Sequence, residues 1–131
     1  MKKTISIIIP FYNEKKNIPL ILNDVKQKLL NSDKYIFEII LMDNNSNDGS
    51  DVIAKKEMDN FKNIKYFRLS RNFGYQSNIK AGLDKCTGDA AVQLDADGED
   101  DPNLIHEFIK EWENGYDVVY GIRKKRIEPF L

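Results

Sequence analysis

Two patterns of apolar and polar positions alternate along the chain. Short apolar runs rich in β-branched and aromatic residues predict strands over residues 4–9, 35–42, 64–69, 90–94 and 116–122. Between these runs, apolar residues recur at steps of three and four, which is typical of helices that bury one face. Strand and helix therefore follow one another in turn.

Four helices are predicted from this spacing. The first begins at Asn17 and carries Ile18, Ile21, Leu22, Val25 and Leu29. A short helix carries Val52, Ile53 and Met58, and a third runs from Gly74 to a stop at Thr87-Gly88. The fourth starts after Pro102 and ends at Gly115. This alternation predicts an α/β domain with a mostly parallel sheet, helices on both faces and right-handed crossovers.

Composition narrows the class of protein. A chain of 131 residues suits one domain, and its net charge of −1 gives no electrostatic argument for nucleic acid as a partner. Cys86 and His106 are each the only residue of their type, so neither a disulfide framework nor a histidine-rich zinc site is expected. The apolar runs are too short to span a bilayer, which needs about 20 apolar residues.

Polar residues gather after the predicted strands. The segments that follow the first four are PFYNE, DNNSNDGS, SRNFGYQ and DADGEDD, and the fifth is followed by RKKR. In a parallel sheet these segments meet at one edge, where such folds bind their ligands. A purely structural domain would use short turns there, so this edge is the predicted functional site.

The acidic segment after the fourth strand has two interpretations. In an extended backbone, Asp95, Asp97 and Glu99 point to one side and can share a hard cation such as Mg²⁺ or Mn²⁺ with a bound diphosphate. The alternative is a solvated turn in which Asp100 or Asp101 caps the next helix, and both interpretations can hold together. Neither this segment nor residues 44–55 fits the spacing of a calcium-binding EF-hand loop.

Other strand ends carry groups suited to a nucleotide. Tyr12 offers a ring for stacking, Glu14 an acceptor, and Asp43 an acceptor for a base N–H or a ribose hydroxyl. Arg71 and Arg123 can bind phosphate through paired hydrogen bonds. No glycine-rich phosphate loop occurs, so a cation and these arginines would have to hold a diphosphate.

Taken together, the segments SIIIPFYNE, LMDNNSNDGS, LSRNFGYQSNIKAGLDKCTGD, VQLDADGEDDP and EWENGYDVVYGIRKKR resemble family 2 glycosyltransferases of the GT-A, Rossmann-like fold. The likeness is greatest to the branch of dolichyl-phosphate mannosyltransferase and bacterial polyprenyl-phosphate glycosyltransferases. It covers nearly the whole of residues 1–131, as the donor-binding part of such an enzyme. The resemblance implies that the acceptor-binding half and any membrane segments of that branch lie outside residues 1–131.

The resemblance implies roles for individual residues. The implied nucleotide contacts are Pro10, Tyr12, Glu14, Asp43 and Asp95, to which we add Arg71. The implied metal ligands are Asp95, Asp97 and Glu99, and the implied catalytic residues are Asp97, Glu99 and Arg123. Arg123 would meet the diphosphate or the acceptor phosphate.

The implied reaction is metal-dependent, inverting transfer of a sugar from a UDP- or GDP-linked donor to a polyprenyl phosphate. In the longer protein this transfer would occur at the cytoplasmic face of the membrane. The sequence leaves open whether the protein forms a homo-oligomer. Two departures leave the base and the metal open. Asn44 and Asn45 stand where many relatives have Asp and Gly. Where relatives commonly read Asp-Leu-Gln-Asp-Pro-Pro, this sequence has Gly98, Glu99, Asp100, Asp101 and Pro102.

Two other functions compete with the transferase. A catalytically silent nucleotide-binding module would share the same donor site. A phosphoreceiver signalling domain has about five βα units at this length, but it needs its phosphoacceptor Asp after the third strand, where Ser70 and Arg71 stand.

Overall fold

The computed structural model describes residues 1–122 of the chain. Its strands are β1 Lys3–Phe11, β2 Tyr35–Asp43, β3 Ile64–Arg68 and β4 Ala90–Gln93. Its helices are α1 Asn17–Val25, α2 Ser50–Asn60, α3 Tyr75–Lys85 and α4 Leu104–Glu113, and α1 continues into a π-helical turn, η1 Lys26–Leu30. The four predicted helices and the first four predicted strands are confirmed. None of the helices among residues 1–122 is long and apolar enough to cross a membrane.

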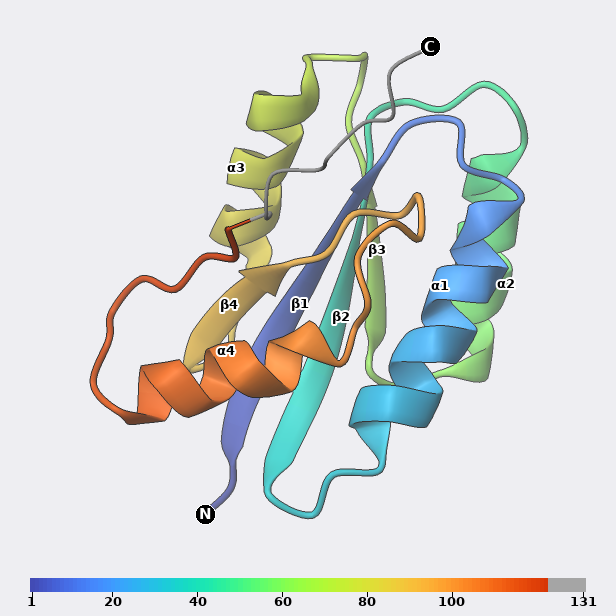
Figure 1. The fold of residues 1–131 in the computed structure, drawn as a ribbon. Helices are drawn as coiled ribbons and strands as arrows, with labels where there is room; N and C mark the ends of the chain where they lie inside the picture. The colour runs from blue at the N-terminus through green and yellow to red at the C-terminus, as the bar shows by residue number, and fades with distance from the viewer. Residues whose placement is uncertain (123–131) are drawn as a thin grey trace, which may run out of the picture.

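The sheet is parallel throughout, with the strand order β3-β2-β1-β4. The chain first builds outward from β1 to β2 and β3, then returns to place β4 on the other side of β1. Because each crossover is expected to be right-handed, this reversal puts α1 and α2 on one face and α3 on the opposite face. The predicted α/β fold with helices on both faces is confirmed (Figure 1).

The two faces of the sheet have separate cores, because successive side chains of a strand point to opposite faces. The larger core joins Ile7 and Ile39 to α1, α2 and α4. The smaller core contains Ile8, Ile40 and Met42 under α3. At Gly82 a Cβ atom would lie 2.6 Å from Ile8 Cγ2, so α3 packs against the sheet at a distance that only glycine permits.

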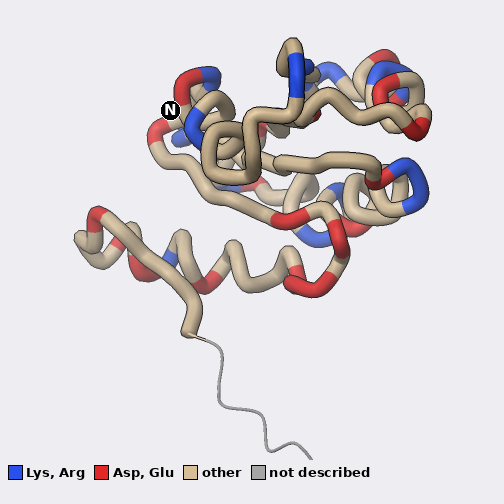
Figure 2. Tube along the Cα trace, turned by 90° about the horizontal axis from the view of Figure 1, so that it is seen from above, with Lys and Arg blue, Asp and Glu red and all other residues tan. Residues whose placement is uncertain are grey.

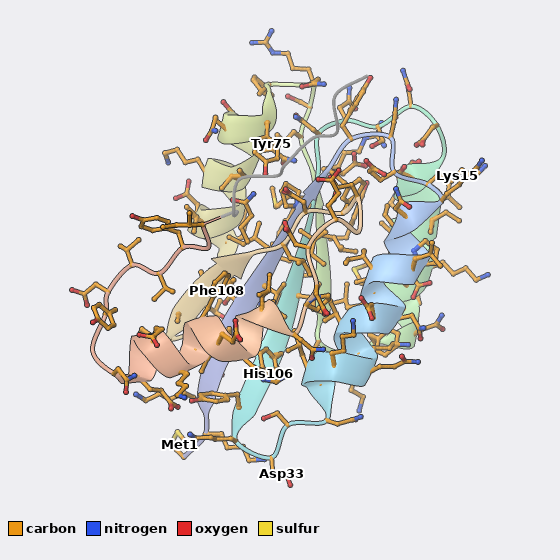
Figure 3. All side chains as sticks on the ribbon, viewed as in Figure 1. Met1, Lys15, Asp33, Tyr75, His106 and Phe108 are labelled. Atoms are coloured by element: carbon orange, nitrogen blue, oxygen red, sulfur yellow. The ribbon has the colours of Figure 1, made fainter. Side chains whose placement is uncertain are left out.

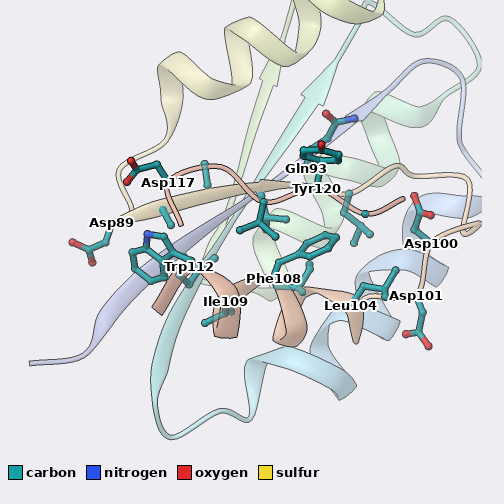
Figure 4. Close-up of a pocket in the computed structure, with 18 of the residues that line it drawn as sticks. Asp89, Gln93, Asp100, Asp101, Leu104, Phe108, Ile109, Trp112, Asp117 and Tyr120 are labelled. Atoms are coloured by element: carbon teal, nitrogen blue, oxygen red, sulfur yellow. The ribbon is translucent and has the colours of Figure 1, made fainter. Parts of the chain in front are cut away.

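The prediction of a fifth strand over residues 116–122 is wrong. This segment leaves α4 at Gly115 and has no strand assignment in the part of the chain that the structure describes. It runs past the edge of β4 and past Phe108 and Trp112 of α4, around an open cavity of about 680 Å³ (Figure 4). The apolar pattern was that of a strand, but a strand also needs a neighbour to accept its backbone hydrogen bonds. Val118 and Ile122 stay largely exposed instead.

Candidate functional site

The loops that follow β1, β2 and β3 are tied to one another at the carboxyl-end edge of the sheet. The Asn13 N–H donates to Ser46 Oγ (2.9 Å), and the Asn47 N–H donates to Asn13 Oδ1 (2.8 Å). The Phe73 N–H donates to Asn44 Oδ1 (3.0 Å). These bonds are made between side chains and backbone of different loops, so they fix the three loops as one unit.

Asp43 is the buried centre of this unit. Its side chain is fully buried, and its Oδ1 accepts the Ser46 N–H at 2.8 Å. Its Oδ2 accepts the Tyr66 hydroxyl at 2.5 Å and lies 3.6 Å from Arg68 Nη1. Burial, and then the hydrogen bond to Asp43, raises the pKa of the Tyr66 hydroxyl, which keeps it protonated as the donor. Asp43 therefore holds the loop in place, and its contact with a base or ribose stays a prediction.

An open cleft of about 420 Å³ lies next to this unit, at the carboxyl ends of β1 and β4. Five of the predicted site residues line it: Pro10, Tyr12, Glu14, Asp95 and Asp97. The cleft falls between the two strands where the sheet order reverses, and α/β folds bind ligands at such switch points. The described residues that line it include three carboxylates but neither Lys nor Arg.

Asp95 is held from two sides within the cleft. Tyr75, at the start of α3, donates its hydroxyl to Asp95 Oδ1 at 2.5 Å, and Gln93 Nε2 donates to the same oxygen at 3.1 Å. Gln93 Nε2 also contacts the Tyr75 hydroxyl. Burial, and then the bond to Asp95, raises the pKa of Tyr75 to about 12. Tyr75 lies at the upper end of the molecule in Figure 3, near the carboxyl ends of the strands.

The three predicted metal ligands do not converge. Among residues 1–122 no group of three or more His, Cys, Asp or Glu side chains could hold a metal ion. The expectation assumed an extended backbone, but Gly98 has a φ of +79° and Asp97 Oδ1 accepts the Glu99 N–H at 3.0 Å. This turn separates Glu99 from the other two, and Glu99 is not among the residues that line the cleft.

Asp95 and Asp97 alone still fit a hard divalent cation. Both line the cleft, both offer carboxylate oxygens, and Mg²⁺ usually takes only one or two carboxylates together with substrate phosphates. The fit is therefore to an ion that a ligand helps to hold, and not to a complete protein cage.

Asp101, at the end of the acidic segment, has a structural role. Asp101 Oδ1 accepts the Asn103 N–H at 3.0 Å, where α4 begins, and also pairs with Lys28 Nζ at 2.9 Å. These two contacts, in that order, lower the pKa of Asp101. Looking down on the carboxyl ends of the strands, Figure 2 shows acidic residues following one another along the segment that leads into α4. Asp101 thus holds the turn before α4, but no side chain caps the first N–H groups of that helix, so capping by Asp100 or Asp101 is not observed. Asp95 and Asp97 face the cleft.

Of the two predicted arginines, only Arg71 lies in the described part of the chain. Arg71 Cζ lies 4.4 Å from the centre of the Phe73 ring, and Arg71 does not line the cleft. Arg123 lies outside the described residues. Phosphate binding by both stays a prediction.

Sequence reasoning missed Tyr75 and Asn78, which also line the cleft. Tyr75 stands in the SRNFGYQ segment, which had been singled out only for Arg71. Asn78 lies one turn into α3, four residues before Gly82, on the face that packs against the sheet. The sequence did hold a sign of this: Asn78 is a polar residue on the same helix face as the glycine four positions later.

The chain belongs to the glycosyl transferase family 2, whose model matches residues 6–130. This match agrees with the order of strands and with the cleft at the switch point. It also leaves the phosphoreceiver alternative without support.

Relatives of known sequence agree with this assignment. The chain is 40% identical over 126 residues to a protein of Synechocystis sp. described as an uncharacterized glycosyltransferase. It is 36% identical over 125 residues to the undecaprenyl-phosphate 4-deoxy-4-formamido-L-arabinose transferase of Pseudomonas syringae. The alignments cover 93% and 95% of this chain but only 38% and 37% of those proteins, so the chain spans well under half of their length.

Solved structures confirm the GT-A fold. A mannosyltransferase from Pyrobaculum calidifontis, in complex with GDP-Man and Mn²⁺, superposes with a TM-score of 0.65 at 22% identity, over 74% of this chain and 28% of that one. TarS from S. aureus, in complex with UDP-GlcNAc, superposes with a TM-score of 0.69 at 23% identity, over 87% and 32% of the two chains.

Proposed function

We propose that this chain is the donor-binding part of a glycosyltransferase that moves a sugar from a nucleotide diphosphate to a polyprenyl phosphate, with inversion and with Mg²⁺ or Mn²⁺ as cofactor. Family membership supports glycosyl transfer, and the Pseudomonas syringae relative, named as an undecaprenyl-phosphate transferase, supports the acceptor class. The complexes of the structural neighbours with GDP-Man or UDP-GlcNAc support a nucleotide sugar as donor.

The charge of the cleft is the observation that carries the proposal. Its described lining has Glu14, Asp95 and Asp97 but no Lys or Arg. A nucleoside diphosphate is itself an anion, so it would be repelled unless a cation lay between it and the carboxylates. Asp95 and Asp97 would hold that cation, which supplies charge stabilisation to the departing diphosphate.

The other residues bind and orient the donor. Tyr12, about two-fifths exposed on the cleft, is free to stack on a nucleobase. Tyr75 keeps Asp95 turned toward the cleft. The acceptor phosphate is already an anion and needs no general base to attack the sugar. Arg123 and Glu99 keep their predicted catalytic roles as part of this proposal.

Titration calorimetry tests the proposal. We expect the chain to bind UDP or GDP at least about tenfold more tightly with Mn²⁺ than without it, a difference of about 1.4 kcal/mol. Asp97→Asn should abolish the effect of Mn²⁺, whereas Asp84→Asn, an exposed carboxylate on α3 paired only with Lys80 in the described structure, should preserve it.

Two results would contradict the proposal. Failure to bind any nucleoside diphosphate in Mn²⁺ would remove the donor site. Tight nucleotide binding that is unchanged by Mn²⁺ and by Asp97→Asn would favour the silent nucleotide-binding module.

A further inference from the structure

The side-chain amide of Asn78 has one atom without a partner. Asn78 is 1% exposed, and its Nδ2 donates to the Met42 carbonyl oxygen at 3.0 Å. Its Oδ1 is buried and accepts no hydrogen bond, a situation shared among residues 1–122 only with the Tyr35 hydroxyl. Buried acceptors are rarely left unpaired, because they lose their hydrogen bonds to water without replacement.

The bond to Met42 fixes which way the amide is turned. If the nitrogen and oxygen were exchanged, two carbonyl oxygens would face each other on the sheet side. Asn78 also lines the cleft of Tyr12 and Asp95. The atom left for a ligand is therefore an acceptor, and an N–H or O–H group of the ligand would satisfy it.

We propose that Asn78 Oδ1 determines specificity by accepting a hydrogen bond from the nucleoside part of the donor, an inference that rests on the proposed function. Phosphate oxygens are acceptors at neutral pH and cannot satisfy another acceptor. The diphosphate belongs with the carboxylates Asp95 and Asp97 and their cation. The nucleoside is the part that brings donors, either the N–H of the base or a ribose hydroxyl, and Tyr12 offers it a stacking surface in the same cleft.

The turn that begins α3 lies directly before Asn78. The Asn78 N–H donates to the Gly74 carbonyl at 3.2 Å, so Gly74 and Tyr75 form the turn directly before it. Gly74 has a φ of +92°, and a Cβ atom there would meet nothing within 4 Å. Gly74 and Tyr75 line the same cleft as Asn78, so this open turn borders the space that a ligand would enter.

Calorimetry on the 131-residue chain in Mn²⁺ tests this contact. UDP and GDP are compared first. The tighter of the two is then compared with its analogues methylated at the base N–H, lacking the 2′-hydroxyl, or lacking the 3′-hydroxyl. We expect the wild-type chain to bind one of these analogues about tenfold more weakly, and the analogue identifies which donor Oδ1 accepts.

Asn78→Ala should bind the parent nucleotide about tenfold more weakly and should no longer distinguish it from that analogue. Asn78→Ser, a second variant in case the first unfolds, should reduce the discrimination as well. Gln76→Ala, exposed on the same helix, should behave like the wild type. Urea unfolding of each variant shows whether the fold is kept.

The outcomes separate the two proposals. If no nucleoside diphosphate binds, the proposed function itself fails. If a nucleotide binds but the wild type treats all analogues alike, or Asn78→Ala keeps the discrimination, the role of Asn78 is overturned and its Oδ1 is left to a buried water.

Discussion

Asp43 ends the buried strand β2, and Asp97 follows the partly exposed strand β4 at the same edge of the sheet, yet the two carboxylates occupy opposite environments. Asp43 is fully buried, with Ser46, Tyr66 and Arg68 around its two oxygens. Asp97 is exposed in the cleft, and the hydrogen bond that it accepts comes from its own turn. A carboxylate after a strand is thus not a functional residue by position alone.

The neighbouring strand makes the difference. β3 lies beside β2 and places Arg68 in register with Asp43. β4 pairs with β1 on one side, and no strand among residues 1–122 lies on its other side. The loop after β4 therefore keeps its carboxylates open to a ligand. Four predictions test this contrast.

Removing Asp43 should have the largest effect. Asp43→Ala leaves the Tyr66 hydroxyl and the Ser46 N–H without an acceptor in a buried place, so we expect the free energy of unfolding to fall by about 3 kcal/mol or more. Urea denaturation measures this loss. A loss below about 1 kcal/mol would show that Asp43 is free for a ligand role, as the sequence had predicted.

Glu38 is a second buried carboxylate. It tests whether the hydrogen-bond partners of a buried carboxylate, and not its place in the sheet, stabilise the fold. Burial alone would raise the pKa of Glu38, but hydrogen bonds from Ser6, Thr87 and Lys65 outweigh burial and lower it to about 2. Because the folded pKa is depressed, the stabilisation is present above the ordinary pKa of 4.5 and is lost as the pH falls toward 2.

For Glu38→Gln we expect a loss of about 2 kcal/mol at pH 7 that shrinks as the pH drops below about 4. Urea unfolding of both proteins from pH 7 down toward pH 2, the region of the lowered Glu38 pKa, measures the difference. A difference that stays constant with pH would mean that charge has no part in it.

Tyr75→Phe should have a smaller effect, confined to ligand binding. The variant removes the hydroxyl that turns Asp95 toward the cleft, so the affinity for a nucleoside diphosphate in Mn²⁺ should fall about threefold to tenfold. The affinity without Mn²⁺ should not change. Equal losses in both conditions would indicate that Tyr75 contacts the nucleotide and does not position Asp95.

Asp97→Asn should have the smallest effect on stability, within about 0.5 kcal/mol of the wild type. The side chain is exposed, and Asn can still accept the Glu99 N–H. Measured beside Asp43→Ala, this variant sharpens the contrast. A loss similar to that of Asp43→Ala would show that the two carboxylates do the same structural work.

Local pattern was a good guide wherever contacts within one element decide the structure. The steps from Ile18 to Val25 predicted α1, and the β-branched run of residues 4–9 predicted β1. The same reasoning failed at residues 116–122, because pairing with another strand is not encoded in the segment itself. The extended backbone assumed between Asp97 and Glu99 is also not observed, because Gly98 turns the chain there, while the role of Glu99 stays a prediction.

The amino-acid sequence by itself determined the four helices, the first four strands, their order, and the polar strand ends that mark one edge of the sheet. These features depend on periodicity and on residues close together in the chain. Only the tertiary structure decided which strand ends meet. The order β3-β2-β1-β4 brings Tyr12 and Asp97 to one cleft, although 85 positions separate them, and turns Asp43 inward against β3. The reason is that strand pairing and helix packing are long-range contacts, and these fix where each carboxylate finds its partner.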